Sequence, residues 1–194
     1  AEQGIRLVND LLDVMAYEQG LKPEFQLVSL DSFLSELHQD YAFQAKEKNI
    51  TLTYENPAKE LRVLIDPDRI RQLFQNLLVN ALKFTESGKN IHLSVMPFQG
   101  RRKNDPPYPM IVVSLRDEGR GIPKAEVEKI FNKFTQVKDY GREQGRGLGL
   151  SVAKQISTLH NGNLWGQRVE GEGSTFFVLF PYVLGHKSIK KATK

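Results

Sequence analysis

Residues 68–84 constrain the fold of this chain more than any other segment, because they define a helix with two very different sides. Apolar residues recur there at the three- and four-residue intervals that are typical of one face of an α-helix. That face comprises Ile70, Leu73, Phe74, Leu77, Leu78, Ala81 and Leu82. Pro67 and Asp68 provide a helix start. The segment is therefore predicted to pack lengthwise against another layer of the protein.

The other side of this helix is polar but carries no carboxylate. Gln72, Asn76, Asn80 and Lys83 fall within an arc of about 80°, given roughly 3.6 residues per turn. A solvated face favours Glu, Lys or Arg, since Asn is a weaker helix former. An amide oxygen can ligate Mg²⁺, and a lysine supplies a point charge for phosphate. A polar face without a task is an equally open alternative.

The remaining patterns predict a helix before residues 68–84 and several short strands along the chain. The helix covers residues 31–48 and is expected to start with Asp31 as its cap. Strands are expected at 26–30, 50–54, 62–65, 90–98, 111–116, 163–169 and 174–182, the last two as a hairpin. Residues 100–109 are polar and proline-rich, which predicts an exposed loop. This order favours helices packed on a single sheet.

A glycine-rich turn at residues 117–123, with the sequence Asp-Glu-Gly-Arg-Gly-Ile-Pro, follows one of these strands. Gly119 and Gly121 permit backbone torsions that other residues resist, and they let a ligand lie against the main chain. Asp117 can accept a hydrogen bond from an exocyclic amine such as that of adenine. An ordinary tight turn containing an acidic residue is the alternative.

A second glycine-rich segment, at residues 145–149, precedes a predicted helix that runs to about residue 159. Glycines at a helix start leave free N–H groups and a positive dipole end, which suit an anion. The Walker P-loop, the dinucleotide fingerprint and the protein-kinase motifs are absent from the sequence. Taken alone, this pattern is a weak indication of phosphate binding.

Two aromatic residues, Phe131 and Phe134, lie between the glycine-rich segments and precede a polar stretch at 138–144. This arrangement suggests a lid hinged over a pocket, with Lys133 placed to meet a terminal phosphate. The alternative is a short helix that packs both phenylalanines into the core.

In this order, the segments resemble the catalytic, ATP-binding domain of sensor histidine kinases, within the wider group that includes gyrase-type ATPases, Hsp90 chaperones and MutL. Residues 76–85 match the family's N box, 117–123 its first glycine box, Phe131 and Phe134 its F box, and 145–149 its second glycine box. The resemblance implies a Bergerat-type α+β fold. This is a two-layer α/β sandwich with a mixed, mostly antiparallel sheet of about five strands on three helices.

The resemblance also implies roles for the matching residues. Asn76 would ligate Mg²⁺ and act in catalysis with Lys83, while Asn80 would approach the metal or the phosphates. Phe84 would line the adenine pocket, and Asp117 would hydrogen-bond the adenine amino group. Further contacts to ATP would come from Gly119, Gly121, Ile122, Lys133, Gly145, Arg146, Gly147, Leu148 and Gly149.

The sequence departs from the family pattern at two places. The second glycine box commonly begins Gly-Gly-Thr or Gly-Gly-Ser, whereas Gln144 and Arg146 stand at the first and third positions here. Arg146 therefore either adds a phosphate contact or crowds the lid. The phosphoacceptor motif, a histidine followed by Glu or Asp, is missing, and His38 is interpreted as a residue on a helix surface. The acceptor is expected upstream of Ala1.

The resemblance divides the chain into three parts. Residues 1–22 would be the end of the second dimerisation and phosphoacceptor helix, and the spacing of apolar residues in 5–17 favours an amphipathic helix. Residues 23–184 would form the catalytic domain. Residues 185–194 would be a basic tail or linker, and its four lysines account for the whole net charge of +4. A formally neutral body disfavours nucleic-acid binding.

The expected function is transfer of the γ-phosphate of ATP to a histidine on the upstream helices, for relay to a response-regulator receiver domain. The full-length protein would form a homodimer, and this fragment a monomer. The chain lacks cysteine and any apolar run of roughly 18 residues, so we expect a cytoplasmic location without membrane contact, whether or not the full-length protein is anchored. The alternatives are a degenerate nucleotide-binding or regulatory module, or an ATPase or protein-serine kinase of the same superfamily.

Overall fold

The computed structural model describes residues 22–98, 109–123, 126–133, 135, 147–169 and 173–183. Their strands are β1 (Gln26–Ser29), β2 (Thr51–Glu55), β3 (Arg62–Ile65), β4 (Asn90–Pro97), β5 (Met110–Asp117), β6 (Asn163–Val169) and β7 (Gly173–Val183). Their helices are α2 (Leu30–Glu47), α3 (Pro67–Phe84), α4 (Gly149–Leu159) and the short 3₁₀ helix η1 (Lys129–Phe131). None of these helices has the length and apolar character that crossing a membrane requires. The predictions for 5–17, 100–108 and 185–194 lie outside the described residues.

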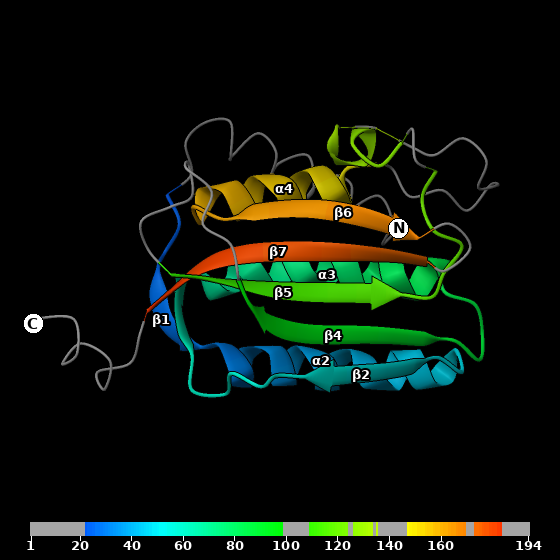
Figure 1. The fold of residues 1–194 in the computed structure, drawn as a ribbon, viewed down its shortest axis with the longest axis horizontal. Helices are drawn as coiled ribbons and strands as arrows, with labels where there is room; N and C mark the ends of the chain where they lie inside the picture. The colour runs from blue at the N-terminus through cyan, green and yellow to red at the C-terminus, as the bar shows by residue number, and fades with distance from the viewer. Residues whose placement is uncertain are drawn as a thin grey trace, which may run out of the picture.

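The described strands form one sheet that is covered on a single face by α2, α3 and α4 (Figure 1). The strand order is β1-β3-β7-β5-β4-β2, and β6 pairs with β7 beside this path. Only β2 and β4 pair in parallel among the described strands. The predicted two-layer sandwich is confirmed. The sheet has seven strands, where about five were expected, because the far end of β7 also pairs with β3, which in turn pairs with β1.

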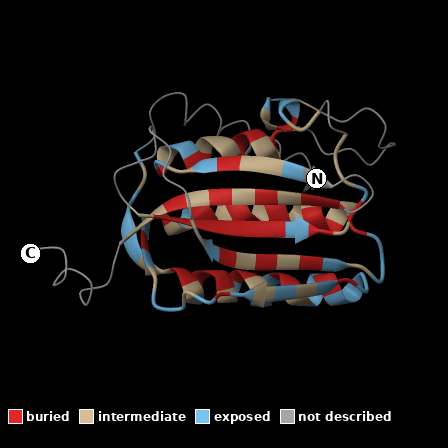
Figure 2. Ribbon diagram, viewed as in Figure 1, coloured by how far each residue is buried: buried red, intermediate tan, exposed pale blue. Residues whose placement is uncertain are grey.

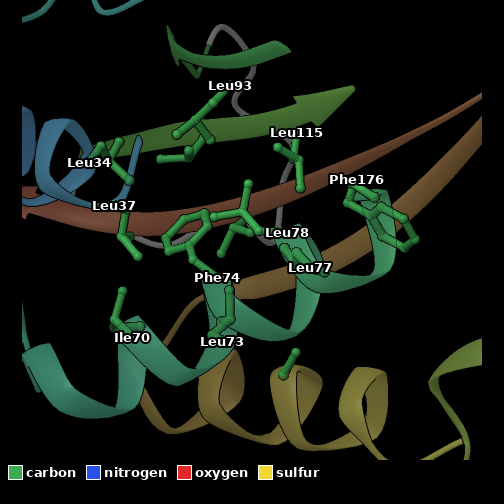
Figure 3. Close-up of a cluster of buried hydrophobic side chains, with 14 of the residues drawn as sticks. Leu34, Leu37, Ile70, Leu73, Phe74, Leu77, Leu78, Leu93, Leu115 and Phe176 are labelled. Atoms are coloured by element: carbon green, nitrogen blue, oxygen red, sulfur yellow. The ribbon is translucent and has the colours of Figure 1, made fainter. Parts of the chain in front are cut away.

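The core lies between α3 and the centre of the sheet. Phe74, Leu77 and Leu78 of α3 are fully buried, and Figure 3 shows them near the sheet residues Leu93 and Leu115. All seven apolar residues predicted for the inner face of α3 are buried. Replacing one such side chain with alanine typically lowers the free energy of unfolding by about 2–5 kcal/mol, because a cavity remains. This packing fixes the rotation of α3 about its own axis.

The central strand β5 ends at Asp117, the first residue of the glycine-rich turn. Every residue of β5 except Arg116 is buried, whereas β4 alternates between buried residues and partly exposed ones (Figure 2). β5 pairs along its length with both β4 and β7, so that Asp117 lies opposite Ile91 and Ser174. The position of Asp117 is therefore set by both neighbouring strands.

An aspartate side chain caps the start of α3. Asp66 is the N-cap, and its Oδ1 accepts a hydrogen bond from the backbone N–H of Arg69 at 3.1 Å. Pro67 occupies the first turn, where a missing N–H leaves no helical hydrogen bond unmade. The acidic Asp68 follows in the first turn, at the positive end of the helix dipole.

Two predictions about α2 are wrong. Its cap is Ser29 and not Asp31, because β1 ends at Ser29 and the helix starts directly after it. Asp31 instead accepts a hydrogen bond from the Tyr54 hydroxyl at 2.8 Å. His38 is half-buried and not a simple surface residue, since its Nε2 lies 3.1 Å from the carbonyl oxygen of Leu52. Through these contacts, both side chains connect α2 to β2.

His160, which follows α4, connects three parts of the chain. Its Nε2 accepts a hydrogen bond from the backbone N–H of Asp66 at 3.0 Å, so its Nδ1 carries the proton and donates to the carbonyl of Ile156 at 2.7 Å. Phe25 packs edge-on against the imidazole, with ring centres 5.3 Å apart. Asp66 Oδ2 also accepts from the backbone N–H of Glu24 at 2.9 Å. This arrangement requires a neutral imidazole.

Acidification is therefore predicted to weaken the fold through His160. Burial lowers the pKa of His160, an effect that the Ile156 carbonyl and Asp66 only partly oppose. The unfolded chain consequently binds the proton first, so stability is complete above the ordinary histidine pKa of about 6.5 and is lost as the pH falls below it. One linked proton changes the unfolding free energy by at most about 1.4 kcal/mol per pH unit.

Urea unfolding at several pH values checks this prediction against a His160→Gln variant, which cannot titrate there. The variant should be less stable at pH 7 by about 1–2 kcal/mol, because buried hydrogen bonds are lost. The difference should shrink as the pH falls towards 5. A difference that stays constant over this range would contradict the assignment.

Candidate functional site

The polar face of α3 forms one side of the candidate site. Asn76, Asn80 and Lys83 are all partly exposed, in contrast to the buried residues of the opposite face. Seven residues separate the first from the last, which corresponds to about 10 Å along the helix axis. The Lys83 ammonium lies 5.2 Å from the centre of the Phe84 ring. The three polar residues are therefore arranged as a row that ends beside an aromatic ring.

The start of α4 lies directly against this row. A Cβ atom placed on Gly149 would be 3.4 Å from both Cγ and Oδ1 of Asn76, which leaves little room for a side chain there. Leu148 is buried and anchors the turn that precedes the helix. Gly147 adopts a positive φ of 70°. The structure thus brings the N box and the described part of the second glycine box together.

The other end of α3 meets the first glycine box. A Cβ atom on Gly119 would lie 2.6 Å from the Phe84 carbonyl oxygen and 2.8 Å from Asp117 Oδ1. Only glycine allows this approach, because real Cβ atoms do not come so close to backbone oxygen. Gly121 has a positive φ of 74°, and Ile122 packs partly buried against the core. Phe84, Asp117 and Gly119, which are predicted to lie at the adenine, are therefore close together.

Asp117 is a buried carboxylate with hydrogen bonds on one oxygen. Oδ1 accepts from the backbone N–H of Gly119 at 2.9 Å and from that of Ser174 at 3.3 Å. Burial raises the pKa of Asp117, and these two backbone hydrogen bonds oppose the increase. Both of these hydrogen bonds are made to Oδ1, so within the described residues Oδ2 can still accept a hydrogen bond from a ligand.

Sequence reasoning missed three residues at this end of the site. Ser174 supplies a hydrogen bond to Asp117, and a Cβ atom on the neighbouring Gly173 would overlap the Asp117 carbonyl. Arg120 places its guanidinium 5.4 Å from the centre of the Phe84 ring. Gly173 and Ser174 are the first residues of β7, where nothing in the local sequence marks them as site residues. Arg120 lies inside a matched motif, so its place in that motif and its positive charge were the available signals.

The F box is only partly described. Ile130 of η1 is buried, and Phe131 packs on Phe176 with ring centres 6.3 Å apart and the planes nearly perpendicular. Phe131 is therefore partly buried against the core, which agrees with the alternative interpretation for this one residue. Lys133 is exposed just after η1. The predictions for Phe134, Gly145 and Arg146 lie outside the described residues.

A magnesium ion would find few protein ligands here. Within the described ranges, no group of three or more His, Cys, Asp or Glu residues is arranged to hold a metal. The amide Nδ2 of Asn76 is buried without a hydrogen-bond partner among the described residues. An amide NH₂ group that lacks an acceptor can donate a hydrogen bond to an oxygen of a bound ligand. Mg²⁺ accepts amide oxygen together with phosphate and water, so Asn76 fits a shared metal site.

Known proteins are similar to this chain in sequence. Residues 65–184 match the family described as histidine kinase-, DNA gyrase B- and HSP90-like ATPases. The sensor protein kinase WalK of Staphylococcus aureus is 32% identical over 184 residues, which are 93% of this chain and 42% of that protein. In WalK of the JH9 strain the matched part is 29% of the protein. The chain therefore spans less than half the length of these relatives.

Solved structures are similar to this chain in fold. The catalytic domain of the histidine kinase ThkA gives a TM-score of 0.68 at 28% identity and covers 81% of this chain and 95% of that domain. ThkA in complex with the response regulator protein TrrA gives 0.72 at 25% identity, covering 93% and 48%. Full-length ShkA in complex with AMPPNP gives 0.77 and covers 95% and 37%, but its 23% identity shows the fold alone. Because the sequence match extends over more than half of its residues, the chain belongs to the family of histidine kinase-, DNA gyrase B- and HSP90-like ATPases.

Proposed function

We propose that residues 23–184 are the ATP-binding catalytic domain of a sensor histidine kinase. The observation that carries this proposal is the meeting of three separate segments around α3. Asn76 lies against Gly149 at one place, and Phe84 lies against Gly119 at another. These segments are far apart in the chain, and each contains a residue type that suits one part of a nucleotide.

The adenine would bind at the carboxyl end of α3. Asp117 Oδ2 would accept a hydrogen bond from the adenine amino group, and burial strengthens such a bond because water competes little there. Phe84 would line the pocket, with Gly121 and Ile122 shaping its wall. Arg120 would hold the Phe84 ring through the contact that the structure already shows.

The triphosphate would lie along the polar row of α3 towards the start of α4. Lys83 and Lys133 would supply positive charge, and Asn80 would approach the phosphates or the metal. The free N–H groups at the start of α4, from Gly147 to Gly149, would face the phosphate oxygens. Mg²⁺, held by the Asn76 amide oxygen with phosphate and water, would neutralise charge on the triphosphate when bound.

The transfer step requires mainly positioning and charge neutralisation. We propose that a neutral imidazole on a helix upstream of Ala1 attacks the γ-phosphorus. The bond from that phosphorus to the β–γ bridging oxygen breaks, and ADP leaves. The phosphoryl group would then pass to an aspartate of a response-regulator receiver domain, a step that the ThkA complex with TrrA makes reasonable. The upstream helices, with residues 1–22 as their end, would pair the full-length protein as a homodimer in the cytoplasm, and residues 185–194 would follow as a tail.

An Asp117→Asn variant is predicted to lose ATP affinity without losing stability. The asparagine oxygen can keep both backbone hydrogen bonds, but its NH₂ group replaces Oδ2 and opposes the adenine amine, donor against donor. Losing a hydrogen bond to a charged group raises the dissociation constant about 10- to 100-fold. The pKa of Asp117 is raised by burial, so removing its charge should leave the melting temperature unchanged or higher.

Calorimetry with ATP and with ITP separates adenine recognition from general damage. ITP carries a carbonyl oxygen in place of the amine, so the variant should lose much less affinity for ITP than for ATP. Equal losses for both nucleotides would show that Asp117 does not contact the purine amine.

Asn76→Ala and Asn80→Asp are predicted to weaken Mg·ATP binding about tenfold or more, because one removes a metal ligand and the other adds negative charge beside the phosphates. Titration calorimetry in the presence and absence of Mg²⁺ measures this. Gln75→Ala, on the same helix but about 100° away from Asn76 around the helix axis, serves as the control. Unchanged affinity in both variants would remove the assigned metal site.

Kinase activity is tested in a polypeptide extended upstream through the acceptor helices. With γ-labelled ATP, it should acquire an acid-labile phosphohistidine, and Asn76→Ala should reduce the label about tenfold or more. Tight Mg·ATP binding without any label would instead indicate a regulatory nucleotide-binding module.

A further inference from the structure

Lys154, on the second turn of α4, makes polar contacts that the proposed site does not use. Its side chain is half-buried, and its Nζ donates hydrogen bonds at 2.6 Å to Asn163 Oδ1 and at 2.6 Å to the carbonyl oxygen of Leu164. Both acceptors belong to the start of β6. Lys154 therefore fastens α4 to the strand beside it.

The same ammonium group also faces the F box. It lies 5.7 Å from the centre of the Phe131 ring, within the range of a cation–π interaction. Phe131 in turn packs on Phe176 of β7, and a Cβ atom on Gly166 of β6 would lie 3.9 Å from Ile130. A lysine has three N–H groups. Two are used by the oxygen acceptors, which leaves one for the aromatic face.

This geometry is specific to lysine. Burial lowers the pKa of Lys154, because desolvation disfavours the charged form. A planar guanidinium cannot direct two hydrogen bonds to these oxygens and a third N–H to the ring in the same way. A methionine would keep most of the buried stem and lose all three polar contacts. The Phe131 ring would then have only its apolar neighbours to hold it.

We infer that Lys154 is a positioning residue for the nucleotide site, acting through the F-box segment 129–133. By holding Phe131 against α4 and β6, it sets where Lys133, two residues further on, stands relative to the start of α4. This inference rests on the proposed function, because Lys133 matters only if phosphate binds there. Lys154 itself touches no substrate.

The experiment is a double-mutant cycle with Lys154→Met and Lys133→Ala in the full 194-residue chain, with Mg·ATP affinity measured by calorimetry. Lys154→Met should weaken binding about tenfold in the wild-type background. In the Lys133→Ala background it should weaken binding less than about twofold, because Lys154 is proposed to affect nucleotide binding only through Lys133. Lys129→Met is the matched control. Its ammonium belongs to η1 but is largely exposed, 3.9 Å from Glu126, and it should change binding less than about twofold.

Hydrogen exchange supplies a readout that is independent of nucleotide. Within η1, the backbone N–H groups of Ile130 and Asn132 are bonded to Glu126 and Lys129 at 2.9 Å. Lys154→Met should speed their exchange about tenfold or more, while the central amides of α3 keep their wild-type protection. Unchanged exchange in η1 would overturn the inference, because Lys154 would then not hold that segment.

Affinity of Lys154→Met within twofold of wild type, or an equal loss in both backgrounds, would overturn the inference. A wild-type chain that fails to bind Mg·ATP would overturn the proposed function instead, and the exchange result would still decide whether Lys154 holds η1. If Lys154→Met shows no cooperative melting, Lys154→Arg replaces it in the same cycle, with an expected loss of about threefold and the same requirement that Lys133→Ala abolish it.

Discussion

The burial of one face of α3 against the sheet is the interaction on which the rest of the structure depends. Phe74, Leu77 and Leu78 have no exposed surface, so the helix cannot rotate about its axis without opening the core. Because successive residues are related by about 100° of rotation, fixing these side chains also fixes the direction of Asn76 and Asn80. The core therefore orients the polar row, and the two faces of α3 act as one unit.

Around this helix, backbone segments of the site approach one another so closely that a side chain would not fit between them. Gly119 lies against the end of α3, and Gly173 lies against the main chain of Asp117. Burial raises the pKa of the Asp117 carboxyl group, so its negative charge does not stabilise the fold. Buried acids with shifted pKa values are typical of functional sites, where a ligand completes what the protein leaves unsatisfied.

α3 and α4 are connected at two places along their lengths. The start of α3 and the end of α4 are joined through Asp66 and His160, which also hold the residues that lead into β1. Further along, Asn76 lies beside Gly149. The antiparallel arrangement of the two helices therefore links the point where the chain enters the fold to the place where phosphate is proposed to bind. Strain at either end would be shared by both helices, because packed interiors deform little.

Local patterns in the sequence were enough to predict the main helices and strands of the described residues, the two faces of α3 and the order of the motifs, because periodicity and motif spacing are local properties. The tertiary structure decided which distant residues complete the site. Ser174 bonds to Asp117 across 57 residues, through a strand register that no local pattern specifies. The cap at Ser29 depended on where β1 stops pairing. The contacts of Lys154 likewise depended on how α4 packs beside β6 and η1. Long-range pairing is set by the packing of the whole core, so it becomes visible only when the chain is folded.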